Sequence, residues 1–278
     1  MIAVILALVG AACYGVSDFV GGMVGKRADA WAVAAAGGLG GAASATLLAL
    51  LNPGDPSGVD LAWGAVAGIG SGTGTAFLYR GLSAGRMGVV APVSGVLAVV
   101  IPVVVAFATG ERPGALVWLG IVSAVPAIWL VAREPTGQAS SASTRSGARD
   151  GVLAGIGFGA LFACLGQIPD PAGFWPLVLN QLVSVLVVAL AATLLGATWV
   201  PRAAAWGGTA AGVLGGVATA AFVVATHHGL LSVSAVLVSL YPAFTILLAA
   251  LVLREHVHRV QAWGLALCGA AVVLVALG

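Results

Sequence analysis

One acidic residue, Asp18, lies well inside a long apolar segment of this 278-residue chain. A charge at membrane depth costs about 2.5–3.5 kcal/mol on insertion scales, so a residue of this kind indicates a function by default. Tyr14 precedes Asp18 by four residues, which places both side chains on one face of a helix. We predict that they line a polar cavity in which Asp18 binds a proton or another coupling cation. The alternative is an ion pair between Asp18 and Lys26 or Arg27 near the end of the same segment.

Neutral polar residues in other apolar segments are predicted to complete this cavity. Tyr79 follows Thr75 by four residues, and Tyr241 precedes Thr245 by four, so each pair shares a helical face. Buried hydroxyls and amides also join helices without touching any solute, so each residue alone is a weak indication. The predicted set for substrate and coupling ion is Tyr14, Asp18, Tyr79, Gln167 and Tyr241.

The elements that position these residues are membrane-spanning helices. Only 7% of the residues are charged and 60% are apolar, too little charge to cover a soluble domain of this length. Ten segments of about 20 apolar residues match the thickness of a bilayer core. They are residues 2–21, 32–51, 61–80, 89–109, 114–132, 151–169, 174–196, 204–227, 231–253 and 259–277.

The distribution of basic residues predicts the orientation. Ten of the eleven Lys and Arg residues fall on the side reached after the first, third, fifth, seventh and ninth segments, and Arg112 alone lies on the other. An excess of basic residues marks the cytoplasmic side. We therefore expect a multi-pass protein of the cell (plasma) membrane with both termini outside.

The sequence also repeats itself. A shift of 144 residues places Gly15 on Gly159, Trp31 on Trp175 and Glu111 on Glu255. Because each half holds five segments, the second half must enter the membrane from the opposite side. The predicted fold is an all-α membrane protein of ten transmembrane helices in two inverted five-helix repeats, an architecture of secondary transporters. The repeats are predicted at 1–132 and 151–278, with a polar linker at 133–150.

The chain resembles the drug/metabolite transporter superfamily, specifically its ten-span EamA-type members. The likeness is carried by Tyr14-Gly15, by Phe158-Gly159, and by the Pro-apolar-Glu block YPAFTILLAALVLRE at 241–255. The first half has Ala98 where this block would place its proline, and the outward termini also depart from the family's expected pattern. The resemblance implies alternating access by two inverted five-helix repeats and transport of small metabolites.

We thus expect a secondary transporter of a small amino acid-like or drug-like solute, with proton coupling at Asp18. A divalent-cation carrier of the same fold is an alternative, although it would need several converging acidic groups. An intramembrane enzyme is a weaker one, because no His lies mid-segment and no GxSG or HExxH motif occurs. We predict no catalytic residue, metal or cofactor. The expected partners are the solute and membrane lipid, with no nucleic acid, and the sequence allows a homo-oligomer.

Overall fold

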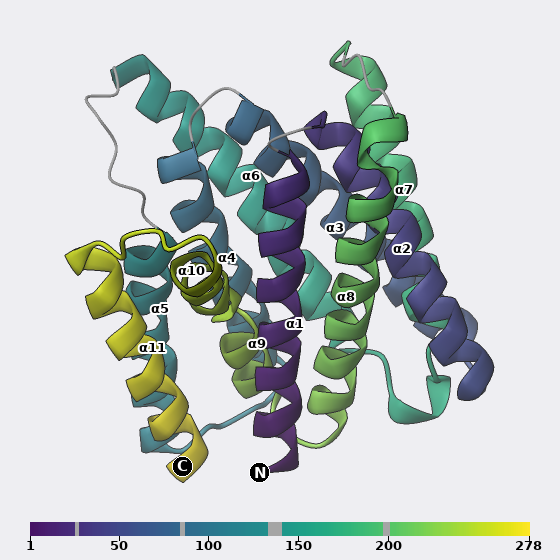
Figure 1. Cartoon of the computed structure of the whole chain (residues 1–278). Coiled ribbons are helices and arrows are strands. Elements are labelled where there is room, and N and C mark those ends of the chain that lie inside the picture. The colour runs from purple at the N-terminus through teal and green to yellow at the C-terminus, as the bar shows by residue number, and fades with distance from the viewer. Residues whose placement is uncertain (26–27, 84–86, 133–140, 197–200) are drawn as a thin grey trace.

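The computed structural model describes residues 1–25, 28–83, 87–132, 141–196 and 201–278, and within these ranges it is helical without strands (Figure 1). The predicted all-α membrane class is therefore confirmed. The helices are α1 (Ile2–Gly25), α2 (Ala30–Leu51), α3 (Gly58–Ser83), α4 (Met87–Ala108), α5 (Ala115–Ala132), α6 (Ser141–Leu165), the 3₁₀ turn η1 (Asp170–Ala172), α7 (Trp175–Leu194), α8 (Pro201–His227), α9 (Leu231–Val238), α10 (Tyr241–Val252) and α11 (Arg259–Leu277).

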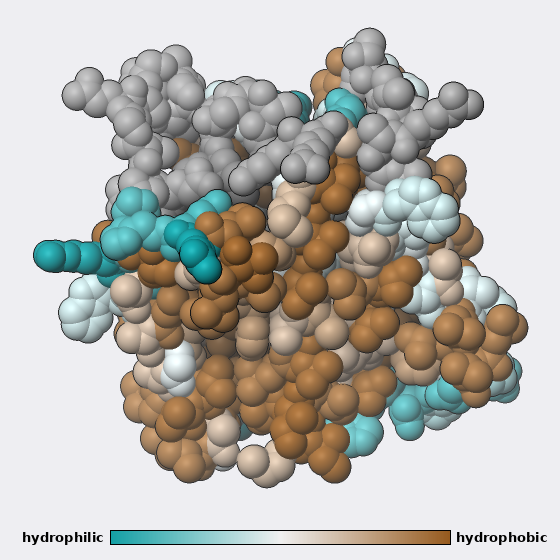
Figure 2. Space-filling model, viewed as in Figure 1, coloured by the Kyte–Doolittle hydropathy of each residue, from teal (hydrophilic) through white to brown (hydrophobic). Residues whose placement is uncertain are grey.

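The helices are long and apolar enough to cross a bilayer. Nine segments of the described chain meet that requirement, with α9 and α10 counted together as Leu231–Val252. The remaining long helix, α3, is glycine-rich and less apolar. Large apolar side chains such as Leu186, Leu194 and Leu251 are exposed, and Figure 2 shows a broad hydrophobic surface on the face in view. In a membrane this surface faces lipid tails, where it has no cost.

Both termini lie at the same end of the bundle (Figure 1), which we call the terminal face. The α4–α5 and α8–α9 connections lie at this face as well. It corresponds to the side that the distribution of basic residues predicts to be outside.

Two segment boundaries differ from the prediction. Helix α6 begins at Ser141, within the stretch expected to be a polar linker, and residues 133–140 lie outside the described residues. The added helical turns bring the buried Asp150 to Arg80 at the end of α3, where the Arg80 Nε donates to the carboxylate at 3.0 Å. The predicted ninth segment, 231–253, consists of two helices, because the chain breaks at Ser239 and Leu240.

The main helix contacts join the two halves of the chain. Helix α1 packs on α8 and α3 on α6, while α2 packs on α8 and α3 on α7. Between α5 and α11, a Cβ atom at Gly120 would lie 2.6 Å from Val275, and one at Gly264 would lie 2.7 Å from Val131. The 144-residue shift converts one contact into the other, because Gly120 corresponds to Gly264 and Val131 corresponds to Val275.

Candidate functional site

Tyr14 connects the middle of α1 to α8. Its hydroxyl lies 2.7 Å from the Oγ1 of Thr219, and the Thr219 hydroxyl donates to the Gly215 carbonyl at 2.8 Å. Because the single proton of Thr219 is used in its own helix, Tyr14 is the donor in the bond between the two side chains. The phenol oxygen therefore keeps its acceptor capacity for another group.

Four rings from four helices surround this bond, and we call them the aromatic cluster. Tyr14 lies 6.0 Å from Tyr241 of α10 and 6.3 Å from Phe162 of α6, measured between ring centroids. Phe162 in turn packs edge to face against Phe222 of α8 at 4.9 Å. Phe162 and Phe222 are buried. The cluster therefore joins the two halves of the chain near the centre of the bundle.

The break between α9 and α10 places Tyr241 beside α1. Leu240 is the N-cap of α10 and Pro242 lies in its first turn, where its missing N–H removes no helical hydrogen bond. In Figure 1, α10 is seen almost along its axis while α1 is seen from the side, so the two helices cross steeply. Broken spans of this kind expose backbone groups at membrane depth only where protein or a cavity satisfies them.

The backbone of α1 approaches α10 closely at Gly15. The Thr245 hydroxyl lies 3.3 Å from the Gly15 carbonyl and 3.2 Å from the Tyr241 carbonyl, so it links the two helices. A Cβ atom at Gly15 would clash with Phe244 and would lie 3.0 Å from the Tyr241 carbonyl oxygen. Only glycine allows this approach, which holds Tyr14 and Tyr241 together.

Two hydroxyls beside the break have no hydrogen-bond partner in the described residues. They are the Oγ atoms of Ser234 and Ser239, which are 0% and 1% exposed. A buried hydroxyl without a partner costs about 1–3 kcal/mol. The broken span therefore carries unused polar groups close to Tyr241.

Asp18 lies one helical turn beyond Tyr14. Although it belongs to an apolar helix, Asp18 is exposed rather than packed against other side chains. Tyr14 and Tyr241 both lie within electrostatic range of it. Within the described ranges Asp18 has neither a hydrogen bond nor an ion pair.

The structure brings together three of the five predicted site residues, Tyr14, Asp18 and Tyr241. Gln167 follows the end of α6, and its side-chain amide donates to the Ala163 carbonyl at 3.2 Å, away from this group. Tyr79 belongs to α3, but its side chain lies outside the described residues. The alternative ion pair with Lys26 or Arg27 lies outside them too.

Sequence reasoning missed three features of the site, namely Phe222, Ser239 and the helix break itself. The usable signal was Tyr241-Pro242, because proline is favoured in the first turn of a new helix as well as at a kink. Nothing in the spacing of Phe222 distinguishes it from other core residues.

Glu111 forms a separate contact at the terminal face. Its Oε1 accepts from the Leu231 N–H at 2.6 Å, and its Oε2 accepts from the N–H and hydroxyl of Ser232 at 3.1 and 2.6 Å. These N–H groups belong to the first turn of α9 and have no partner within the helix. Glu111 therefore caps α9.

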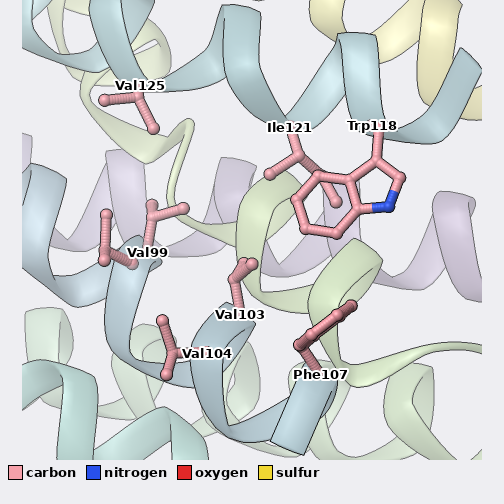
Figure 3. Close-up of a pocket in the computed structure, with 8 residues that line it drawn as sticks. Val99, Val103, Val104, Phe107, Trp118, Ile121 and Val125 are labelled. Atoms are coloured by element: carbon pink, nitrogen blue, oxygen red, sulfur yellow. The ribbon is translucent and has the colours of Figure 1, made fainter. Parts of the chain in front are cut away.

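A cavity of about 230 Å³ lies between α4 and α5, away from these polar residues (Figure 3). Its lining side chains are apolar except for the indole N–H of Trp118, and Val104 and Phe107 are exposed at its edge. Such a groove has almost no group to orient a polar solute. Elsewhere, within the described residues, no three His, Cys, Asp or Glu side chains converge as a metal site would require.

Comparisons with known proteins agree with this architecture. Residues 147–277 match the family model of the EamA-like transporter family. A solved structure, titled only "Crystal structure of protein", covers 99% of this chain and 98% of its own chain, with a TM-score of 0.79 and 14% sequence identity. At that identity the likeness shows the fold alone, and it extends over both halves. No curated protein matches the chain.

Proposed function

Because residues 147–277 match the model of the EamA-like transporter family and the likeness in fold covers the whole chain, we propose that the protein carries a small organic solute by alternating access. The solute binds beside Tyr14 and Tyr241, and Asp18 couples its movement to protons. The observation that carries this proposal is an exposed carboxylate without a described partner, one helical turn from Tyr14, whose ring contacts Tyr241 of the broken span. Carboxylates inside membrane segments mark substrate or proton pathways.

We propose that the two halves form an inverted repeat, an arrangement that would support alternating access. Contacts between the halves occur in exchanged pairs: Gly120 with Val275 and Gly264 with Val131. A second pair of contacts corresponds in the same way. Gly15 lies close to Thr245 in α10, and its counterpart Gly159 lies close to Ile101 in α4, which is the counterpart of Thr245. Two related halves with exchanged contacts are able to rock around a central site. The aromatic cluster lies where α1, α6, α8 and α10 meet, which is the position such a site requires.

The environment of Asp18 supports the proposed proton coupling. An ionised carboxylate at this depth has to be neutralised, either by a bound proton or by a cation. If protonation alternates with solute binding on one side of the membrane, a proton gradient drives the solute. Asp18 then changes state once in each cycle, and the rest of the site stays neutral.

Proteoliposomes test this proposal. A thermal-shift panel of amino acids, nucleosides, amines and organic acids first identifies a ligand, since a ligand at 100 times its Kd adds about 2.7 kcal/mol of stability. Flux of that ligand is then measured with and without a pH gradient. Asp18→Asn is expected to abolish the response to the gradient while the protein stays folded. Asp55→Asn, on an exposed loop, serves as the matched control. Unchanged gradient-driven flux in Asp18→Asn refutes the coupling role.

A further inference from the structure

We infer that the groove between α4 and α5 binds an anionic phospholipid of the bilayer. An acyl chain lies between the two helices, and the phosphate lies on Arg112 at the end of the groove nearest the terminal face. This inference is independent of the transport proposed at Tyr14 and Asp18. It is carried by an apolar cavity of about 230 Å³ with an exposed edge, and by an arginine that contacts the cavity through Phe107.

The groove has the direction and length of an acyl chain. Its α4 wall runs from Phe107, in the last turn, back to Val99, and its α5 wall runs from Trp118, near the start, to Val125. In Figure 3 the two aromatic rings lie at one end of the groove, and Val99 and Val125 lie at the other. Eight residues of α-helix rise about 12 Å, which is most of the depth of one leaflet when the whole hydrocarbon core is about 30 Å thick.

The groove opens toward lipid. Val104 and Phe107 at its edge are exposed, and so are Leu119 and Val122 of α5, each next in sequence to a lining residue. The one polar group among the lining side chains is the indole N–H of Trp118, a residue type enriched at the membrane interface. An acyl chain needs no polar partner, whereas a polar solute does.

Arg112 places a positive charge at the end of this groove. The residue is exposed, and its guanidinium carbon lies 4.4 Å from the ring centroid of Phe107, which packs edge to face on Trp118 at 6.1 Å. The Arg112 Nη1 donates to the carbonyls of Phe107 and Glu111 at 2.9 and 2.8 Å. Its Nε and Nη2 groups have no partner among the described residues. The planar fork of an arginine suits the oxygens of a phosphate group.

The carboxylate next in sequence does not neutralise this charge. Both oxygens of Glu111 accept from Leu231 and Ser232 of α9, and Arg112 forms no ion pair within the described part of the chain. Arg112 is also the single Lys or Arg that the sequence places on this side, against the usual distribution of basic residues. A zwitterionic lipid would bring its own cation beside the guanidinium, so the charge favours an anionic head group.

Quenching of Trp118 by brominated lipids tests this inference. The full chain is reconstituted in phosphatidylcholine nanodiscs that contain a small fraction of phosphatidylglycerol or phosphatidylcholine with brominated acyl chains. Subtraction of the signal of Trp118→Phe isolates the quenching at the groove. We expect brominated phosphatidylglycerol to quench this component at about fivefold lower concentration than brominated phosphatidylcholine, the preference that one basic residue near the surface gives.

Two pairs of variants assign the preference to the charge and to the groove. Arg112→Gln should remove the preference and Arg112→Lys should keep most of it, which separates the charge from the contacts that Arg112 makes at the end of α4. Arg259→Gln, at the start of α11, removes an exposed arginine elsewhere and should change nothing. Val100→Phe places a ring in the groove and should reduce quenching by both lipids, whereas Val122→Phe on the exposed surface of α5 should not.

Several results would overturn the inference. They are equal quenching by the two lipids in the wild type, a preference that survives Arg112→Gln, and unchanged quenching in Val100→Phe. Absence of quenching by either lipid would overturn it as well, and a dimer in light scattering would then identify a second copy of this chain as the partner that covers the groove.

Discussion

The cap that Glu111 forms on α9 allows a quantitative prediction. In Glu111→Gln the side chain keeps one carbonyl oxygen, but its NH₂ group faces N–H donors of α9, and the charge near the helix N-terminus is lost. A hydrogen bond to a charged group contributes about 1.5–3 kcal/mol, and the charge–dipole term adds about 0.3–1 kcal/mol. Since Glu111 is partly exposed, the lower end of this range applies, and we expect a loss of about 2 kcal/mol.

The loss should be concentrated in α9. This helix has eight residues, and isolated helices of that length are marginal, so its end depends on contacts from outside. A change of about 2 kcal/mol corresponds to about a 30-fold increase in local opening. Hydrogen exchange of the protein in nanodiscs measures this opening in peptides that cover Leu231 to Val238. Peptides from α11 should exchange as in the wild type.

Two further variants make the result interpretable. Glu111→Ala removes every acceptor and should open α9 at least as much as Glu111→Gln. Asp55→Asn removes a carboxylate from an exposed loop at the same face and should change nothing in α9. Identical α9 exchange in Glu111→Gln and the wild type would refute the capping argument, and so would an equal increase in Asp55→Asn.

Three other predictions follow from the packing and the repeat. Gly15→Ala should destabilise the protein by about 1–3 kcal/mol, because the added methyl group overpacks against α10. Gly22→Ala lies on the same helix with open space around it, so it should be neutral or stabilise the protein by up to about 1 kcal/mol. Equal unfolding temperatures for the two variants would contradict the close approach at Gly15. Under the 144-residue shift Glu111 maps to Glu255 and Leu231 to Met87, so Glu255→Gln should increase hydrogen exchange at the start of α4, and an unchanged α4 would argue against an inverted repeat. Both termini are predicted to lie outside, so alkaline phosphatase fused to the C-terminus should be active in cells, whereas green fluorescent protein fused at the same position should not fluoresce. The reverse pattern would contradict the predicted orientation.

Much of the fold could be predicted because the determinants of membrane helices are local. Uninterrupted apolar length indicates a span, and the i, i+4 spacing of Tyr14 and Asp18 places both on one face. The structure keeps these two residues together with Tyr241. These predictions needed only the geometry of a single helix.

The remaining features depend on contacts between helices and so could not be read from the sequence. The apolar run 231–253 predicts one span equally well whether Pro242 kinks a helix or starts a new one. The residue type of Gln167 predicts a cavity position, whereas its contact with the Ala163 carbonyl, just beyond the end of α6 at Leu165, depends on where the helix ends. Asp150, which lies just before the predicted start of the sixth segment, belongs to α6 and contacts Arg80, a partner 70 positions away in sequence.

The residues of the proposed site have no matching counterparts under the 144-residue shift. The 144-residue shift maps Tyr14 to Phe158 and Asp18 to Phe162, and it maps Leu97 to Tyr241. The polar residues Tyr14, Asp18 and Tyr241 therefore correspond to the apolar residues Phe158, Phe162 and Leu97 in the other half. A symmetric pair of carboxylates would repel each other or share one proton, and neither would bind a single charge cleanly. If Asp18 couples transport as proposed, a single carboxylate takes up one proton in each cycle without a second acidic group that competes for it.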